Sequence, residues 1–349
     1  MNLLSLGLAT LLASPALAQT CQLTGTIAGL GNKPLLCYYT QKGVRHTDTI
    51  RVAHDQFTYV AKPSDDGTAA LYIPGASSRA SFWVEPGPLL VQGNAAQPGQ
   101  LQVTGTPENN VLAEHNRTVS WEYDVTKAKT TAEAEATKKL YNQATVTFIK
   151  AHPAARTSAD LLYWQMLMAS NAPLAGYEQL AAHLSPNVRQ SFQGQQVAKR
   201  LLILQNRPTV GRPVADFTIA DTAGVKHSLA IYQGKYVLLD FWGHWCSPCI
   251  KAMPKVKALH AQYAPKLTII GIGMEAPGDR TVWKQAIRRY GVPGLQLSEL
   301  QGDEGPVISG YNVTAFPTYM LLDPKGVLVM STNDVDDITK KLTTLGDFR

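Results

Sequence analysis

The sequence feature that most limits how this chain can fold is the stretch KYVLLDFWGHWCSPCIKAMP, which ends at Pro254. Its first part, KYVLLDFWG, is an almost continuous apolar run, as expected of a strand that is buried on both faces of a sheet. Residues 247–264, which follow it, carry the spacing of a helix. Cys246 and Cys249 therefore stand where a buried strand passes into a helix, and this junction favours an α/β domain.

Residues 207–349 continue the alternation of strands and helices. A second apolar run, LTIIGIGM, predicts another buried strand, and DRTVWKQAIRRYG predicts a helix that stops at Gly291. The runs TYMLLD and VLVMST flank the turn Asp323-Pro324-Lys325-Gly326 and predict an antiparallel hairpin, with a closing helix in DVDDITKKLTTLG. This order predicts a three-layer α/β domain with a mixed sheet.

Two further regions precede this domain, and a chain of 349 residues is long enough for two or three domains. Over residues 19–107, short alternating runs such as QLTGTIAG, QFTYVA and AALYI are separated by turn-forming residues. This pattern predicts an all-β sandwich or barrel, whose role the sequence leaves open. Residues 108–206 include long segments with helical spacing, among them EAEATKKLYNQATVTFIKAH, and are expected to form a helical spacer.

Residues 1–18, MNLLSLGLATLLASPALA, have the pattern of a secretory signal peptide. An apolar run leads to the small-x-small sequence after which signal peptidase cuts, although no Lys or Arg precedes the run. The alternative is an N-terminal strand or helix of the core. Lipoprotein anchoring at Cys21 is not expected, because Ala18-Gln19-Thr20 is a poor match to the small-residue box that it requires.

The rest of the chain indicates an exported protein without a membrane span. No other segment approaches the roughly 18 apolar residues that a spanning helix needs. The mature chain is therefore expected in the periplasm or another extracytoplasmic compartment. Its formal net charge of +6 comes from scattered residues without a Lys/Arg block, so no nucleic-acid partner is expected.

Of the four cysteines, Cys21 and Cys37 lie in the β-rich region. A hairpin that turned at Gly31-Asn32 would place Cys37 opposite residues 26–27. At about 3.3 Å per residue this is too far from Cys21 for a bridge, unless the N-terminus doubles back. The sequence leaves this disulfide open.

The position of Cys246-Ser247-Pro248-Cys249 at the start of a helix suits thiol chemistry. Unpaired N–H groups and the positive end of the helix dipole stabilise a thiolate there, which makes Cys246 a good nucleophile. Cys249 lies three residues on, on the same helix face, near enough to close a disulfide. The spacing therefore suits dithiol–disulfide exchange, with Cys246 attacking and Cys249 resolving the mixed disulfide.

Three other uses of the cysteine pair fit the sequence less well. A zinc site needs two further ligands. After Cys249 the chain has one His, His260, and no Cys, and His244 lies too close to Cys246 in sequence to act easily as a ligand. A c-type haem site needs His directly after the second cysteine, where Ile250 stands. A purely structural disulfide over so short a loop stabilises little. A redox centre without metal or other cofactor is therefore expected.

These residues resemble the thioredoxin family, in the strand ending Asp-Phe-Trp, the Trp-Cys-x-Pro-Cys centre and the proline five residues later, Pro254. More narrowly, FWGHWCSPCIKAMPKVKALHAQYA resembles the exported TlpA/ResA-like thiol-disulfide oxidoreductases. The resemblance is specific over residues 211–335. Over residues 20–205 it is architectural, a β-rich domain and helical spacer like those of the long periplasmic members.

The resemblance implies roles for five residues around the centre. Cys246 matches the nucleophile and Cys249 the resolving thiol. Pro317, in TAFPTYMLLD, matches the proline that is cis in this family and faces the cysteines, and Phe316 before it would pair its backbone with an extended substrate. Asp240 matches the buried acid that exchanges a proton with the resolving thiol; the alternative is a solvated acid at the end of a strand.

Four further residues are candidates for docking or redox tuning. Trp245 is expected to shield the disulfide and to form part of the docking surface. The alternative is a role in packing alone, and the two roles are compatible. Ser247 and Pro248, between the cysteines, are expected to tune the reduction potential. Ser247 departs from the residues usual in relatives, which leaves the direction of electron transfer open. His244 would add positive potential near Cys246 when protonated, or is simply a surface residue.

The expected function is a periplasmic reductase of disulfides in exported proteins, which a membrane electron donor would reduce again. An oxidase or isomerase of the same fold is the first alternative. A peroxiredoxin-like peroxidase would need Pro and Thr or Ser where Leu239 and Gly243 stand. A surface-binding protein that acts through its β domain is the last alternative. The sequence names neither the client proteins nor the oligomeric state.

Overall fold

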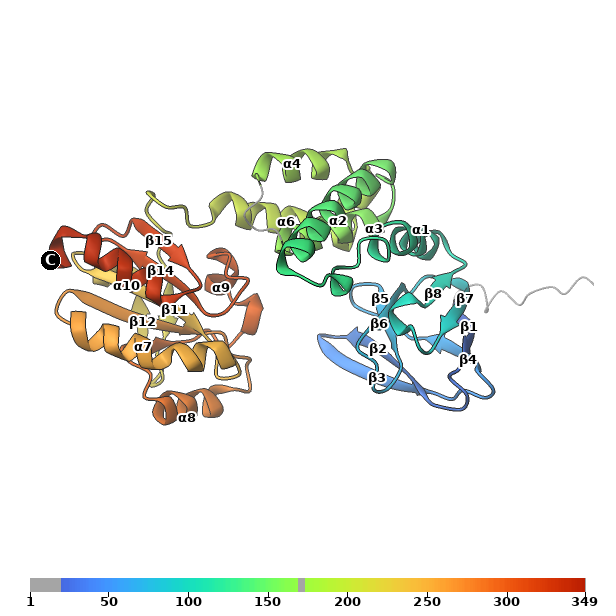
Figure 1. Ribbon diagram of the computed structural model, residues 1–349, viewed down its shortest axis with the longest axis horizontal. Coiled ribbons are helices and arrows are strands. Elements are labelled where there is room, and N and C mark those ends of the chain that lie inside the picture. The colour runs from blue at the N-terminus through green and yellow to red at the C-terminus, as the bar shows by residue number, and fades with distance from the viewer. Residues whose placement is uncertain (1–19, 169–172, 349) are drawn as a thin grey trace, which may run out of the picture. The chain divides into compact units, whose positions relative to one another are not determined.

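The computed structural model describes residues 20–168 and 173–348, so the expected signal peptide, residues 1–18, lies outside the described residues. The chain divides into two compact units: residues 1–165 with 175–198, and residues 166–174 with 199–349. Figure 1 shows the elements of both. Among the described residues, no helix combines the length and the apolar character needed to cross a membrane.

The second unit is built on a five-stranded sheet in the order β13-β12-β11-β14-β15. Its strands are β11 (Tyr236–Trp242), β12 (Leu267–Gly273), β13 (Leu295–Leu297), β14 (Thr318–Leu322) and β15 (Leu328–Thr332). The first three run parallel, whereas β14 pairs antiparallel with both β11 and β15. The predicted mixed sheet is confirmed, and the apolar run that precedes the cysteines provides its central strand.

Each face of this sheet carries its own core. Leu238 and Trp242 of β11 pack into one core with α7, α8 and α10, while Leu239 and Phe241 point to the other side. The elements around the sheet are α7 (Ser247–Tyr263), α8 (Arg280–Tyr290), α10 (Val335–Thr344), α9 (Pro306–Gly310), β9 (Thr218–Ala220), β10 (Lys226–Ser228), η5 (Leu229–Tyr232), η6 (Gly302–Glu304) and η7 (Gly346–Phe348). The unit is the predicted three-layer, thioredoxin-like α/β fold (Figure 1).

The first unit contains two four-stranded sheets that enclose one core. The sheet β4-β1-β7-β8 is made of β1 (Cys21–Ala28), β4 (Gln56–Ala61), β7 (Gly87–Asn94) and β8 (Gln102–Thr104). The sheet β3-β2-β5-β6 is made of β2 (Leu35–Gln41), β3 (Val44–Ile50), β5 (Thr68–Tyr72) and β6 (Arg79–Trp83). Alternate residues of both sheets face the shared core, such as Leu23 and Leu71. The predicted strand-rich region is therefore a sandwich.

Helices follow the sandwich in sequence. They are α1 (Pro107–His115), α2 (Thr131–Ala151), α3 (Arg156–Met168), α4 (Leu174–His183), α5 (Pro186–Gln190) and α6 (Phe192–Asn206), with short turns η2 (Pro98–Gln100), η3 (Asn116–Ser120) and η4 (Val125–Lys127). Buried polar contacts hold α1 and α3 to β6. The Asn109 carboxamide exchanges two hydrogen bonds of 2.9 Å with the Trp83 backbone, and the Trp83 indole donates to Thr157.

The strands on either side of Gly31-Asn32 do not pair as a hairpin. The strands β1 and β2 lie in different sheets, because the chain crosses the sandwich after Ala28 instead of folding back alongside itself. Cys21 and Cys37 are consequently both buried in the core that the sheets share, and they form no disulfide with each other. Burial raises the pKa of each thiol to about 11.

Candidate active site

Cys246 is the residue that caps the N-terminus of α7, directly after the loop that leaves β11. Its Sγ accepts a hydrogen bond of 3.2 Å from the Cys249 backbone N–H. Pro248 stands in the first turn, where its fixed φ suits a helix and its missing N–H costs nothing. The strand–turn–helix order of the sequence therefore brings one sulfur to the positive end of a helix dipole.

Cys246 and Cys249 form a disulfide, with their Cα atoms 5.3 Å apart. Both residues are buried, at 3% and 1% exposure. Between them, Ser247 and Pro248 are exposed and bring no charged group to the sulfurs. Reduction of this disulfide to two thiols takes up two electrons. Because both sulfur-bearing residues are buried, a reaction partner must dock closely to reach them.

The loop before β14 lies against the residue that precedes Cys246. The Phe316–Pro317 peptide bond is cis, as the resemblance implies. The ring of Phe316 meets that of Trp245 edge to face, with centroids 5.6 Å apart. Trp245 is 49% exposed, so its indole is both a cover and an available contact surface.

Asn333 holds this loop in place, and the sequence analysis did not single it out. Its side-chain amide donates to the Pro317 carbonyl at 2.6 Å and to the Thr318 hydroxyl at 3.0 Å. Asn333 follows β15 and so lies across from the start of β14 in the hairpin. The predicted hairpin brought these segments together, but no motif marks the asparagine.

Asp240 lies on the face of β11 that also carries Leu238 and Trp242, the face covered by α7. It is 2% exposed, and its Oδ1 has no hydrogen-bond partner among the described residues. Desolvation raises the pKa of this carboxyl to about 7. The alternative of a solvated strand-end acid is therefore wrong, because the side chain points into the core and not into water.

Tyr319 is directly opposite Asp240 in the antiparallel pair of β11 and β14. Its side chain is 1% exposed, in the core that also holds Cys249. Burial, and then the nearby Asp240 carboxylate, raise the pKa of the Tyr319 phenol. The phenol therefore stays neutral and makes the surroundings of the Asp240 carboxyl still less accessible to water.

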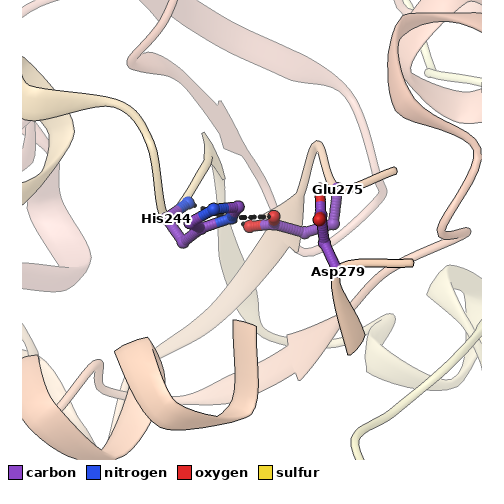
Figure 2. Close-up of side chains that lie close together, drawn as sticks. All are labelled: His244, Glu275 and Asp279. Carbon is purple, nitrogen blue, oxygen red and sulfur yellow. Dashed lines mark hydrogen bonds and ion pairs between the residues drawn. The ribbon is translucent and has the colours of Figure 1, made fainter. Parts of the chain in front are cut away.

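His244 is not a free surface residue. Its backbone N–H donates to Glu275 Oε1 at 2.9 Å, and its ring Nδ1 pairs with Glu275 Oε2 (Figure 2). The Glu275 side chain is fully buried, whereas that of His244 is 27% exposed. Burial raises the pKa of the Glu275 carboxyl, and the two hydrogen bonds from His244 oppose that rise.

Glu275 is the functional candidate that the sequence analysis missed. It follows β12, which runs parallel to β11, and the carboxyl ends of neighbouring parallel strands meet at one edge of a sheet. That rule would have placed it beside His244. The same loop binds the Trp245 indole, which donates to the Met274 carbonyl at 3.0 Å.

Asp279 stands next to this pair, and the ligand atoms of His244, Glu275 and Asp279 lie within 4.8 Å of one another (Figure 2). Such a set could in principle hold a cation. However, both Glu275 oxygens are already hydrogen-bonded to His244, and an Asp279 oxygen accepts from the Ala276 N–H at 3.0 Å. The arrangement is satisfied as a hydrogen-bonded clamp on the loop before Cys246.

Two family models match the chain. Residues 210–331 match the AhpC/TSA family, and residues 21–112 match a domain of unknown function, DUF4369. The first match covers the sheet and the cysteine pair, and the second covers the sandwich and the start of α1. The two matches together thus cover both the thioredoxin-like unit and the strand-rich region.

Relatives of known name match just over a third of the chain. The thioredoxin-like protein YneN of Bacillus subtilis is 31% identical over 118 residues, 34% of this chain and 68% of that protein. ResA of Geobacillus kaustophilus, a thiol-disulfide oxidoreductase, is 30% identical over 141 residues, 39% of this chain and 78% of that protein.

A solved structure, the thioredoxin domain of a thiol-disulfide oxidoreductase from Bacteroides vulgatus, is 29% identical. The match covers 39% of this chain and 96% of the solved chain, with a TM-score of 0.36. The disulfide at the head of α7 and the sequence relatives agree: this chain belongs to the thioredoxin-like thiol-disulfide oxidoreductases of the ResA type, with a DUF4369 region ahead of its enzyme domain.

Proposed function

We propose that this enzyme is a reductase of disulfides in exported proteins, acting in the periplasm or another extracytoplasmic compartment. The observation that carries the proposal is the Cys246–Cys249 pair at the start of α7, with Cys246 at the helix N-terminus and the ring of Phe316 packed against Trp245. In the first step, the Cys246 thiolate attacks one sulfur of a client disulfide. That bond breaks, a client thiolate leaves, and a mixed disulfide forms.

In the second step, Cys249 resolves the mixed disulfide. The Cys249 thiol gives its proton to the carboxylate of Asp240, whose pKa of about 7 suits transfer near neutral pH. The Cys249 thiolate then attacks Cys246 Sγ, the second client thiolate leaves, and the Cys246–Cys249 disulfide forms. Two electrons have passed to the client, and the thiols carry both without a metal or organic cofactor.

The surroundings of the pair favour reduction over oxidation. A strongly oxidising centre needs its reduced form to be stabilised by added positive charge near the nucleophilic thiolate. Ser247 and Pro248 supply none. His244 is paired with the buried Glu275, so a positive charge on its imidazole would be offset by the neighbouring carboxylate.

Substrate docking and regeneration complete the proposal. The backbone of Phe316 would pair with an extended segment of the client, and the exposed Trp245 would cover its side chains. Thiols outside the cytoplasm have no access to cytosolic reductants, so a membrane electron donor would reduce the disulfide again. Cell fractionation tests the location, and N-terminal sequencing of the exported chain is expected to begin at Gln19.

The direction of transfer is tested by equilibrating the Cys246–Cys249 couple with glutathione and dithiothreitol buffers. A reduction potential near about −270 mV, the value of thioredoxin, is expected. A potential near about −120 mV, the value of a strong oxidant, would overturn the reductase assignment in favour of an oxidase.

Insulin reduction tests the roles of the two cysteines separately. Cys246→Ala is expected to abolish turnover because the attacking sulfur is lost. Cys249→Ala keeps that sulfur but cannot resolve, so it is expected to accumulate a mixed disulfide, visible on a non-reducing gel. If Cys246→Ala reduces insulin as the unchanged enzyme does, the redox function is wrong and binding by the β domain becomes the better account.

A further inference from the structure

A cavity of about 450 Å³ lies in the first unit, on the outer face of the sheet β3-β2-β5-β6. Small side chains in the middle of that face create it. Ala70 of β5 is paired with Tyr38 of β2 on one side and with Ser81 of β6 on the other. Thr68, two residues before Ala70 on β5, lies on the same face of the sheet. The short side chains of Ala70 and Ser81 leave space above the sheet, and the ring of Tyr38 lies beside that space.

Helix residues form the opposite wall. Asp160, Tyr163 and Trp164 of α3 are three and four residues apart, so they share one helix face, and all three line the cavity. Phe192, at the start of α6, lines it as well. Trp164 is 50% exposed and Phe192 is 48% exposed. Large aromatic side chains left half in water beside a cavity are typical of a binding surface and not of a core.

Three ionisable side chains that line the cavity, those of Arg45, Arg79 and Asp160, have no partner in the part of the chain that the structure describes. Arg45 and Arg79 stand on the two edge strands of the sheet, β3 and β6, and both are exposed. Among the described residues, neither guanidinium group makes a hydrogen bond or an ion pair, and the Asp160 carboxyl makes none either. Burial, and then the nearby Asp66 carboxylate, raise the pKa of Asp160 to about 6.

We propose that this cavity binds a peptide segment in which a large aromatic side chain is flanked by carboxylates. The aromatic side chain would lie over Ala70, against Tyr38 and Trp164. The two guanidinium groups match carboxylates in charge and in bidentate geometry, and a peptide N–H would donate to Asp160. The volume lies within the range of about 300–1,000 Å³ that is usual for ligand pockets.

Charge favours a peptide over a glycan as the occupant. A neutral sugar would stack on the aromatic rings but would leave both guanidinium groups without a counter-charge. An acidic, aromatic peptide satisfies the rings and the two guanidinium groups together. Asp66 also lines the cavity, but its carboxylate already accepts from the Ser64 hydroxyl and the Thr68 N–H. The site would make the first unit a client-binding module, and binding there does not depend on the state of Cys246.

Calorimetric titration of the mature, oxidised full chain tests the proposal. The probe is a blocked pentapeptide of sequence GDFDG, with GKFKG, GDADG and maltoheptaose as comparisons. GDFDG is expected to bind at least tenfold more tightly than each of the others. Equal binding of the three peptides, or binding of maltoheptaose in place of GDFDG, would overturn the assignment.

Variants locate the binding in the cavity. The double variant Arg45→Gln/Arg79→Gln is expected to weaken GDFDG binding at least tenfold, and Arg117→Gln, which alters an exposed arginine outside the cavity, is expected to leave it unchanged. If the double variant binds GDFDG as well as Arg117→Gln does, the proposal fails. The arginine side chains are exposed, so this comparison does not depend on a change in the core.

Filling the cavity gives a second, independent check. Ala70→Phe places a ring where the ligand would lie and is expected to lower peptide affinity at least tenfold while insulin reduction stays within twofold. Unchanged peptide affinity in a folded Ala70→Phe chain would contradict the site. Conversely, Cys246→Ala is expected to lose insulin reduction and keep GDFDG binding, so failure of the proposed redox function is distinguished from failure of the cavity.

Discussion

At the scale of single residues, Asp240 shows how burial sets chemistry. Its carboxyl is 2% exposed and its pKa rises from 3.8 to about 7, because desolvation penalises the charged form. The shift corresponds to roughly 4 kcal/mol at about 1.36 kcal/mol per pKa unit. Since the folded-state pKa is the higher one, the native chain binds more protons between about pH 4 and pH 7, and its stability falls as pH rises through that window.

The variant Asp240→Asn is expected to remove this pH dependence. At pH 8 it should be about 1–4 kcal/mol more stable than the unchanged chain, because no buried charge forms. Urea unfolding of the oxidised chain at pH 5 and pH 8 measures the difference. The same variant should reduce insulin more slowly, since Cys249 loses its proton acceptor. Identical urea midpoints at pH 8 would show that the carboxylate carries no such penalty.

Cys21 and Cys37 show the opposite use of burial, where a thiol is made inert. Burial raises the pKa of both to about 11, so almost no thiolate is present at neutral pH. After mild reduction, iodoacetamide at pH 7.5 is expected to alkylate Cys246 and to leave Cys21 and Cys37 unmodified until urea unfolds the sandwich. Peptide mass mapping measures this, and rapid labelling of Cys37 in the native chain would contradict the assigned burial.

At the scale of elements, the loops after β11 and β12 act together. Glu275 holds both the backbone and the ring of His244, and the Met274 N–H donates to the Trp242 carbonyl at 2.8 Å. The segment before Cys246 is therefore bonded on its open side to a neighbouring loop. This arrangement fixes where the sulfur lies and cancels the charge that His244 would otherwise bring.

Removing the acid should expose that charge. In Glu275→Ala a positive charge on the His244 imidazole near Cys246 is no longer offset by a carboxylate. The thiolate is then favoured, and the reduction potential is expected to rise by roughly 30 mV for each 1.4 kcal/mol of added stabilisation. Equilibration of the variant and the unchanged enzyme with glutathione and dithiothreitol buffers measures the difference.

Two controls make the Glu275→Ala result specific. Glu275→Gln keeps an acceptor for the His244 N–H and tests the charge alone. A His244→Asn/Glu275→Ala double variant removes the imidazole, and its potential is expected to return toward that of the unchanged enzyme. A potential that rises equally in the double variant would mean that loop distortion, and not the imidazole charge, is responsible.

At the scale of the whole molecule, the enzyme domain has its own cores. Both cores of the second unit draw on residues between Val214 and Phe348, one on each side of the sheet. A fragment that starts at residue 207 is therefore expected to fold, to keep its reduction potential within about 30 mV of the full chain, and to lose GDFDG binding. Circular dichroism and the buffer titration measure this. An unfolded fragment would show that the first unit supports the enzyme domain.

Much of the enzyme domain was predictable because its signals are local. The run from Tyr236 to Trp242 has to be a buried strand, and Cys246 has to cap the helix after it, whatever the rest of the chain does. The cis Phe316–Pro317 bond could be predicted only through the resemblance. The residues next to a proline do not specify whether its peptide bond is cis or trans.

The sequence by itself determined the redox chemistry, the α/β class of the enzyme domain and the strand-rich character of the region before it. The tertiary structure alone decided that β1 and β2 lie in different sheets, that Glu275 holds His244, and that small residues such as Ala70 leave a cavity. The reason is physical. Spacing along the chain specifies on which face of its own helix or strand a side chain lies. Which other helix or strand packs against that face depends on contacts between residues far apart in sequence.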